Sequence, residues 1–565
     1  MNRKKIVIVG GVAGGMSCAA RARRLSETAE IIVFERGPHP SFANCGLPYH
    51  MGGEIADASK LVVQSAEKLR QVQNLDVRTR CEVLKIDRAN KEVLVHNLQT
   101  GEHFKESYEA LVLSPGAAPL RPPIPGIDLP GVFTLRNIPD MEAILERITT
   151  ANAKRIVVGG GGYIGLEVAE QLRHRGLEVA VAEAAPQVMM PVDAELAELL
   201  HAEIRRNGVE LFLQDAIARF EGVSEADSEG HSPLIVHLKS GAALPADVVI
   251  LGLGVKPENT LAKDAGLEIG ALGGIRVNEH MQTNDPTIYA VGDAVEVKDV
   301  VTQQWALIPL AGPANRMGRI VADNLFGMHS TYNGTQGTAV LRVFQLVAGC
   351  TGANEKTCTR LGLEYESIHL HPTSHAGYYP GAHPIAMKVL FNPTTGKLLG
   401  AQAVGKDGVD KRIDVFATAL AAGFTMDDLA ELELAYAPPF GSAKDPVNLA
   451  GMISQNLQAG LVRQVQWNEL QTPEYKDAVI LDVRDKSERD AGALPNSLHI
   501  PLGEIRNRLS ELPKERLLIV HCASGQRSYN ACRILTQNGF NAVNLSGSYK
   551  TWAAAMQRAQ QSTTP

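Results

Sequence analysis

The sequence lacks the long apolar runs and the leader segment that mark membrane-bound or secreted proteins. No apolar run approaches the about 18 residues that a transmembrane helix needs. The charged segment Met1–Lys5 leads straight into the strand-like segment Ile6–Val9, where a secretory signal would continue with an apolar core. These absences predict a cytoplasmic protein without a membrane partner.

Cysteine is also scarce, with seven residues in a chain of 565 and no pair in Cys-x-x-Cys spacing. This excludes the disulfide framework of small secreted proteins and offers no ligand pattern for zinc, so no metal site is predicted. The net charge of −7 argues against nucleic acid as the main partner. The length exceeds the roughly 250–300 residues at which a single core stops growing, which predicts several domains.

A glycine-rich loop follows the first strand-like segment. Ile6–Val9 leads into Gly10-Gly11-Val12-Ala13-Gly14-Gly15 and then into an Ala/Arg-rich helix, whose N-terminal amides can hold a pyrophosphate. Glu35 ends the next strand about 25 residues after Gly10, where a carboxylate accepts hydrogen bonds from a ribose diol. Val12 stands where the pattern usually has its second glycine, so an ordinary glycine turn stays open as an alternative. The dinucleotide contacts predicted here are Gly10, Ala13, Gly14, Gly15 and Glu35.

A second loop of the same kind follows the strand-like segment Ile156–Val158. It carries all three glycines of the pattern, Gly160, Gly162 and Gly165, and the next strand ends in Glu183, about 23 residues after the first of them. A carboxylate at this position favours a free ribose 2′-hydroxyl and repels a 2′-phosphate. The sequence therefore predicts NADH rather than NADPH at this loop.

A lone thiol, Cys45, lies just beyond the first glycine loop in the run Ser41-Phe42-Ala43-Asn44-Cys45-Gly46-Leu47-Pro48-Tyr49. Two later segments suit a flavin. Leu111–Gly116 is typical of a strand and turn, and Ile288–Asp293 is a strand that ends in an acid able to bond the ribityl or ribose region. A helix N-cap is the alternative role for Asp293.

These motifs together resemble the flavoprotein disulfide reductases with two dinucleotide-binding domains, over residues 1–455. The single cysteine in Ser-Phe-x-x-Cys-Gly-Leu-Pro-Tyr resembles the coenzyme A disulfide reductases and the related NADH oxidases and peroxidases. The cysteine pair of glutathione reductase-like members is missing. The resemblance implies FAD at the first loop, NADH at the second and Cys45 as the catalytic thiol. It implies further flavin contacts at Asn44, Ser114, Gly116 and Asp293.

Coenzyme A is the substrate or bound ligand that this resemblance implies. Ser41 and Asn44 flank the thiol and are predicted to contact the substrate or hold the negative charge of the sulfur. The basic cluster Arg21, Arg23 and Arg24, on the helix after the first loop, is predicted to meet the phosphates of coenzyme A. A solvated helix face is the alternative reading of this cluster.

The same resemblance implies a homodimer held together by an interface domain. Two of its segments, Ser374–Gly381 and Tyr436–Asp445, correspond to segments that carry a tyrosine to the partner subunit's thiol. The matching residues are Tyr378 and Tyr436, predicted to be catalytic. Phe440 replaces a second tyrosine that relatives often have. The alternative is that both tyrosines are interface aromatics whose hydroxyls are merely satisfied.

The pattern restarts near residue 460 with a small α/β segment of about 100 residues. Its strand ends at His521 and delivers Cys522 into Ala523-Ser524-Gly525-Gln526-Arg527-Ser528, which resembles a rhodanese loop with Cys522 and Arg527 as site residues. Only four residues separate Cys522 from Arg527, whereas phosphatases of similar fold enclose five. A tight ring of amides at a helix start suits one sulfane sulfur and lowers the thiol pKa. The remaining cysteines are expected to be packing residues, with a resolving role left open as the alternative for Cys532.

The predicted fold class is α/β: two Rossmann-like dinucleotide-binding domains (FAD and NAD), an α+β dimerisation domain and a C-terminal α/β rhodanese domain. The expected boundaries are 1–117 for the first part of the FAD-binding domain, 118–253 for the NAD-binding domain with its connection, 254–330 for the second part of the FAD-binding domain, 331–455 for the dimerisation domain and 465–560 for the rhodanese domain.

The function expected from these parts is an FAD-dependent NADH:coenzyme A persulfide or polysulfide reductase that also reduces coenzyme A disulfide. Cys45 would reduce the S–S bond and release sulfide or free thiol, and Cys522 would carry sulfane sulfur. One alternative is an NADH oxidase or peroxidase in which Cys45 cycles through a sulfenic acid. The other is a sulfur-relay or redox-sensing protein that acts through a protein partner.

Overall fold

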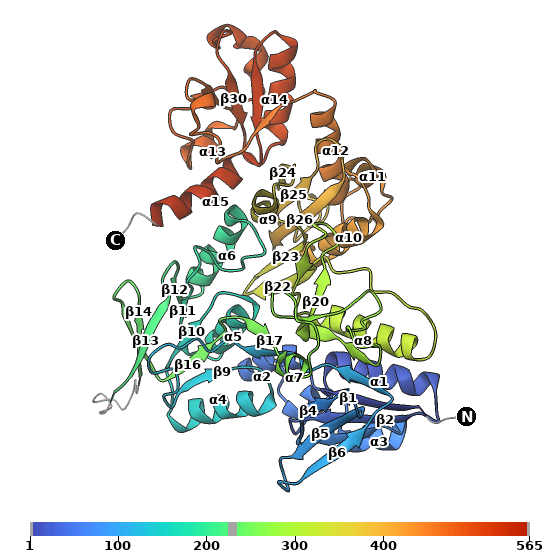
Figure 1. The fold of residues 1–565 in the computed structure, drawn as a ribbon. Coiled ribbons are helices and arrows are strands. Elements are labelled where there is room, and N and C mark those ends of the chain that lie inside the picture. The colour runs from blue at the N-terminus through green and yellow to red at the C-terminus, as the bar shows by residue number, and fades with distance from the viewer. Residues whose placement is uncertain (1–3, 224–233, 562–565) are drawn as a thin grey trace. The chain divides into compact units, whose positions relative to one another are not determined.

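The computed structural model describes residues 4–223 and 234–561, and the chain divides into two compact units. The first unit comprises Met1–Pro186 and Gly208–Gly337, and the second comprises Gln187–Asn207 and Thr338–Pro565. Figure 1 follows the chain through both. No helix within the described residues is both long and apolar enough to cross a membrane.

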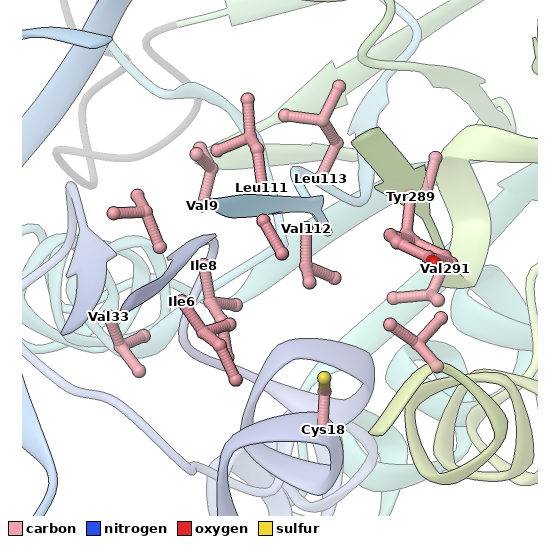
Figure 2. Packing of buried hydrophobic residues seen from close by; sticks show 14 of the residues in the cluster. Ile6, Ile8, Val9, Cys18, Val33, Leu111, Val112, Leu113, Tyr289 and Val291 are labelled. Carbon is pink, nitrogen blue, oxygen red and sulfur yellow. The ribbon is translucent and has the colours of Figure 1, made fainter. Parts of the chain in front are cut away.

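The first unit begins with a five-stranded parallel sheet in the order β19-β7-β1-β2-β3. Its strands read as almost continuous apolar runs because both faces of a parallel sheet are covered. Figure 2 shows how Ile6, Ile8, Val112 and Cys18 pack in the core of this sheet. The bounds are β1 Lys5–Val9, β2 Glu30–Glu35, β3 Asp76–Thr79, β7 Ala110–Leu113 and β19 Ile288–Ala290, with helices α1 Ala13–Leu25 and α8 Ala311–Leu325 packed on one another.

A second five-stranded parallel sheet, in the order β12-β11-β10-β16-β9, lies in the same unit. Helix α5 (Tyr163–His174) follows its central strand, as α1 follows β1 in the first sheet. The chain therefore builds the strand, glycine loop and helix arrangement twice, as predicted. The bounds are β9 Val132–Thr134, β10 Arg155–Gly159, β11 Glu178–Ala182, β12 Val209–Phe212 and β16 Val248–Leu251.

Both glycine loops need glycine for the same two reasons. Gly10 and Gly160 have φ angles of +99° and +102°, which L side chains rarely adopt. A Cβ at Gly15 would come within 1.9 Å of the Gly10 oxygen, and one at Gly165 within 2.0 Å of the Gly160 oxygen. The last glycine of each loop thus lets the helix pack directly against the turn.

The second unit contains an antiparallel five-stranded sheet in the order β22-β23-β26-β25-β24. Helix α10 (Val409–Ala422) packs on β23 and β26. Helix α6 (Ala194–Arg206) also packs on this sheet, although its residues precede β12 of the first unit in sequence. The bounds are β22 Ala339–Val343, β23 Leu346–Gly352, β24 Glu366–Leu370, β25 Ile385–Phe391 and β26 Leu398–Gly405.

The C-terminal part of the second unit is a parallel sheet in the order β27-β31-β30-β28-β29. Helix α14 (Gln526–Gln537) follows β30 after a short loop, and α15 (Ser548–Gln561) follows β31. These sheets confirm the predicted α/β fold class. The bounds are β27 Gln464–Val465, β28 Val479–Asp482, β29 Leu498–His499, β30 Leu518–His521 and β31 Ala542–Leu545.

Candidate active site

A cavity of about 730 Å³ opens in the first unit where the carboxyl ends of β1, β2 and β7 meet. Open α/β sheets bind ligands at this edge, and the volume lies within the about 300–1,000 Å³ typical of cofactor sites. Gly15 lies behind the wall, closing the loop onto α1. The other residues predicted to touch the flavin line the cavity, namely Gly10, Ala13, Gly14, Glu35, Asn44, Ser114, Gly116 and Asp293.

The two strand-terminal carboxylates brace their glycine loops in the same way. Glu35 accepts hydrogen bonds from the N–H groups of Gly11 and Gly37, both at 2.7 Å. Glu183 accepts from those of Gly161 and Ala185, both at 2.6 Å. A carboxylate offers about four lone-pair sites, so each can still accept a ribose hydroxyl. The spacing that predicted these acids as ribose contacts therefore also places them as supports of the loop.

Two arginines that the sequence analysis did not identify also line the cavity. Arg36 and Arg136 both form ion pairs with Glu258, the former at 2.6 Å, and Arg136 donates to the Pro115 oxygen at 3.1 Å. Burial raises the pKa of Asp293 in the same cavity, and the charge of Arg136 partly offsets this. Arg136 follows β9, an edge strand of the second dinucleotide sheet, where no motif marks it.

The donor set of this cavity fits a flavin dinucleotide. Amides at the start of α1 and two arginines suit a diphosphate, whereas Glu35 and Asp293 offer acceptors for ribose and ribityl hydroxyls. Gly14, in the first turn of α1, allows this helix to pack closely against the segments of Ser114 and Val291. A Cβ there would lie 2.9 Å from both Ser114 Oγ and a Val291 methyl.

Cys45 lies in a short 3-10 turn, Asn44–Gly46, immediately before helix α2 (Leu47–Gly52), and it is exposed. Although part of its surface is exposed, desolvation by the surrounding residues raises the pKa of its thiol, the charges of Glu167 and Asp293 raise it further, and a backbone hydrogen bond lowers it. The polypeptide alone therefore does not favour the Cys45 thiolate. The predicted support from Ser41 and Asn44 stays a prediction.

The segment around Cys45 is fixed by backbone contacts and by α5. Ser41 adopts a φ of 49°, and its N–H donates to the Gly11 oxygen at 2.7 Å, which ties this segment to the first glycine loop. The Tyr49 hydroxyl donates to Glu167 on α5 at 3.1 Å. Glu167 thus places a charge near Cys45 from a helix of the second dinucleotide sheet, which no sequence motif indicated.

The three arginines predicted to meet coenzyme A phosphates have different environments on α1. Arg23 is buried, and its guanidinium donates to backbone oxygens of Ser26, Glu27, Gln73 and Asn74. This burial favours a structural role for Arg23 over a phosphate contact.

Arg21 and Arg24, unlike Arg23, are not buried. Arg21 pairs with Asp323 of α8 at 2.6 Å, and Arg24 is exposed. A phosphate contact stays a prediction for these two.

The tyrosines predicted to be catalytic, Tyr378 and Tyr436, lie together in the second unit. Their hydroxyl oxygens are 3.0 Å apart, and this hydrogen bond raises the pKa of Tyr378. The side chains are 77% and 47% exposed on the single chain, which suits residues that reach another molecule. Phe440 of the second segment is exposed as well.

Backbone and ion-pair contacts hold the two tyrosine segments in place. The Ala376 N–H donates to the Gly441 oxygen at 2.8 Å, which links one segment directly to the other. The buried pair Arg412–Asp445, at 2.9 Å, fixes the end of the second segment against α10. The structure therefore brings both predicted tyrosines into one small polar cluster.

Cys522 directly follows β30 and begins the tight loop that leads into α14. Its sulfur accepts a hydrogen bond from the Gly525 N–H at 3.1 Å and one from the Ser528 hydroxyl at 3.4 Å. Burial opposes ionisation, but these bonds and the neighbouring amides outweigh it and lower the pKa of the thiol. Ser528 lies in the first turn of α14, immediately after Arg527, and was not predicted as a site residue.

Arg527 holds this loop to the helix α13 (Lys486–Asp490). Its guanidinium pairs with Glu488 at 2.6 Å and with Asp485 at 3.2 Å. Its charge is therefore shared with two carboxylates near the thiol. The predicted packing role of the other cysteines is confirmed by their burial at Cys18, Cys81, Cys350, Cys358 and Cys532.

Two groups of potential metal ligands occur among the described residues. Asp193, Glu195 and Glu355 surround the Lys388 ammonium, which lies 2.7 Å from Glu195 and from Glu355 and so supplies the positive charge. The other group consists of Glu54, Glu170 and His174, and in it Glu54 accepts a hydrogen bond from Gln171 at 3.0 Å. Neither group adds to the site.

Comparison of the sequence with known protein families identifies the class to which this fold and its two thiol sites belong. The pattern of the pyridine nucleotide-disulphide oxidoreductase family matches residues 4–317, that of its dimerisation domain residues 338–446 and that of the rhodanese-like domain residues 464–555. The chain therefore belongs to the pyridine nucleotide-disulphide oxidoreductase family. It is a flavin-dependent oxidoreductase of the disulfide-reducing type with a C-terminal rhodanese domain.

Individual proteins that are similar to this chain over most of its length include reductases of coenzyme A disulfide and of persulfide. The coenzyme A disulfide reductase of Staphylococcus epidermidis is 37% identical over 452 residues, which are 80% of this chain and 100% of the relative. The crystal structure of reduced Bacillus anthracis CoADR-RHD is 46% identical, with 99% of both chains covered and a TM-score of 0.95. The NAD-dependent persulfide reductase from A. fulgidus is 37% identical, with 97% of this chain and 100% of that one covered and a TM-score of 0.89. The predicted family and enzyme class are confirmed.

Proposed function

We propose that the protein is an NADH:coenzyme A persulfide or polysulfide reductase that also reduces coenzyme A disulfide. The observation that carries this proposal is the pair of unlike thiols, Cys45 beside a dinucleotide cavity and Cys522 in a tight loop that lowers its pKa. The relatives named for coenzyme A disulfide and for persulfide support the substrate class. The reaction consumes NADH, a proton and the persulfide, and it yields NAD, coenzyme A and hydrogen sulfide.

The chain's own residues divide the work. The cavity in the first unit would hold FAD through Glu35, Asp293 and the backbone amides at the start of α1. When bound, the flavin supplies two-electron transfer from a nicotinamide to a sulfur. Cys45 attacks the S–S bond of the substrate and keeps one sulfur as a mixed disulfide or persulfide until two electrons release it. Cys522 accepts sulfane sulfur and presents it for reduction, which leaves Cys522 as a thiolate again.

NADH rather than NADPH is the proposed electron donor. Glu183 directly follows β11, and its carboxylate lies beside the second glycine loop, where it accepts hydrogen bonds from the uncharged residues Gly161 and Ala185. A 2′-phosphate at this position would meet a negative charge, whereas a ribose hydroxyl would donate to it.

The active form proposed is a homodimer. The dimerisation-domain match over residues 338–446 and the exposure of Tyr378 and Tyr436 support it. In such a dimer these tyrosines would reach the partner's thiol and protonate the departing thiolate, which contributes about 10²-fold in rate. A cytoplasmic location, where coenzyme A and NADH are available, is part of this proposal.

An anaerobic turnover experiment tests the function. Coenzyme A persulfide and NADH are added to the wild type, to Cys45→Ser and to Cys522→Ser, and NADH loss and sulfide release are followed together. We expect one sulfide per NADH in the wild type, no turnover in Cys45→Ser, and a residual rate in Cys522→Ser that measures the traffic through the rhodanese domain.

Two controls make the result specific. Cys532→Ser replaces a buried thiol of the rhodanese domain and should turn over like the wild type. Rapid NADH loss in air without any sulfur substrate would favour an NADH oxidase instead. Wild-type turnover in Cys45→Ser would remove the thiol mechanism altogether.

A further inference from the structure

Ser548, at the junction of β31 and α15, has a backbone conformation that serine rarely adopts. Its φ is 54°, in the left-handed region, and its side chain is fully buried. Among the non-glycine residues with positive φ in the described part of the chain, it alone is both polar and buried. An unusual backbone held in place by its surroundings points to a function for the side chain that it orients.

The Ser548 hydroxyl lies among the groups of the rhodanese thiol site. The Cys522 N–H donates to Ser548 Oγ at 3.2 Å, and this oxygen lies 3.1 Å from Ser528 Oγ and 3.8 Å from the Cys522 sulfur. The Leu545 carbonyl oxygen is a further acceptor at 3.3 Å. All three side chains, those of Cys522, Ser528 and Ser548, are buried.

The contact between the two serine hydroxyls can be directed either way, because either oxygen can be the donor. A hydroxyl has one proton to donate and two lone pairs. Ser528 faces three acceptors for its proton, the sulfur at 3.4 Å, the Gly525 oxygen at 3.0 Å and Ser548 Oγ. If Ser548 donates its own proton to Ser528 Oγ, the Ser528 proton is released from that third acceptor and can stay on the sulfur.

We propose that Ser548 is a positioning residue of the rhodanese domain, whose hydroxyl holds the Ser528 hydroxyl on the Cys522 sulfur in a two-serine relay. The Cys522 N–H fixes Ser548 Oγ, and the left-handed backbone brings that oxygen to this place. The relay stabilises the anionic sulfur that accepts and carries sulfane sulfur. This inference rests on the proposed function of Cys522 as a sulfur carrier.

The test measures the acidity of Cys522 in the flavin-loaded Cys45→Ser protein, where no exposed cysteine competes among the described residues. Alkylation of Cys522 by iodoacetamide is followed across pH by mass spectrometry. The midpoint of the pH profile reports the thiol pKa, so limited access to a buried sulfur slows every point without moving the midpoint. Ser548→Gly, Ser548→Ala, Ser528→Ala and the double variant Ser528→Ala/Ser548→Gly are compared.

We expect Ser548→Gly and Ser548→Ala to raise the midpoint by about one unit, which is an about tenfold slower alkylation below the midpoint. The double variant should match Ser528→Ala, because Ser548 acts through that hydroxyl. Glycine accepts the left-handed backbone, so Ser548→Gly should also melt at a higher temperature than Ser548→Ala. A purely structural serine would shift the melting temperature alone.

An unchanged midpoint in Ser548→Gly would overturn the relay, and so would additive shifts in the double variant. The result is separate from that of the turnover experiment. Shifted midpoints without sulfide release would leave the relay standing and remove the proposed function. Sulfide release that depends on Cys522, with no shift in the midpoint, would support the proposed function and overturn the relay.

Discussion

At the scale of residues, the two thiols proposed to act in sulfur transfer, Cys45 and Cys522, have opposite electrostatic settings. Burial and the carboxylates of Glu167 and Asp293 raise the pKa of Cys45, whereas hydrogen bonds at the Cys522 loop outweigh burial and lower the pKa of that thiol. Cys522 therefore ionises through its own loop. The residues around Cys45 disfavour its thiolate, so we expect positive charge or hydrogen-bond donors from a bound cofactor to be needed for its ionisation.

Sequence spacing located some residues of the site and missed others for a physical reason. Glu35 and Glu183 could be predicted because a strand of fixed length places its terminal acid beside the glycine loop. Arg136, Glu167 and Ser548 could not, because each reaches its site through packing between segments that are distant in sequence. No local pattern encodes such contacts.

Replacement of Glu183 tests the choice of nicotinamide. Glu183→Gln removes the charge while it keeps the size of the side chain. We expect the ratio of kcat/KM for NADH to that for NADPH to fall about tenfold, because a hydrogen bond to a charged group is worth about 1.5–3 kcal/mol. Steady-state kinetics with both nucleotides measure it. Glu210→Gln, an exposed position on β12 with the same change in charge, should leave the ratio unaltered. An equal ratio in both variants would argue against this role.

At the scale of elements, the strand, glycine loop and helix units were predictable because steric demands on the backbone leave traces in the sequence. The strands β1, β10 and β30 lie where the apolar runs placed them. The replacement of the second pattern glycine by Val12 did not prevent the first loop from forming, since Gly10 and Gly15 meet its tightest contacts. The placement of α6 on the antiparallel sheet of the second unit had no such trace.

Substitutions at two glycines of the second loop are expected to affect different properties, stability at Gly165 and NADH binding at Gly162. A Cβ at Gly165 would clash with the Gly160 oxygen, so Gly165→Ala should cost about 1–3 kcal/mol of stability and lower the melting temperature. A Cβ at Gly162 meets nothing within 4 Å, so Gly162→Ala should fold normally. It should nevertheless raise the KM for NADH, because the loop must approach the pyrophosphate closely.

Melting curves and NADH kinetics on both variants check this pair. The two effects are expected to separate, with the loss of stability confined to Gly165→Ala. A Gly162→Ala protein with wild-type KM would mean that the dinucleotide does not approach the loop at that position.

At the scale of the whole molecule, a buried charge cluster holds α6 in the second unit. The Lys388 ammonium on β25 lies 2.7 Å from Glu195 and 3.1 Å from Asp193, and it also pairs with Glu355 of helix α9 (Glu355–Leu361). His369 on β24 adds a 2.8 Å contact to Glu195. The neighbouring carboxylates keep the pKa of Lys388 above its usual range despite burial, and the cations hold that of Glu195 well below its own.

Removal of this lysine tests the cluster. Lys388→Met leaves three carboxylates without their common cation, and breaking a buried ion pair in this way costs about 3–5 kcal/mol. The midpoint of urea unfolding of the flavin-loaded protein should fall accordingly. Lys105→Met removes an exposed lysine that pairs with Glu92 and should change the midpoint little. The double variant Lys388→Met/Glu195→Gln should recover part of the loss, and a Lys388→Met protein as stable as the wild type would contradict the role of the cluster.

The placement of α6 also decides how the chain can be taken apart. The backbone passes between the two units three times, after Pro186, after Asn207 and after Gly337. A protease that cuts only after Gly337 leaves Gln187–Asn207 on the N-terminal fragment, while that segment stays folded against the sheet of the C-terminal one. The two fragments of a singly nicked protein therefore stay associated through α6, and they separate only when α6 dissociates from the sheet of the second unit.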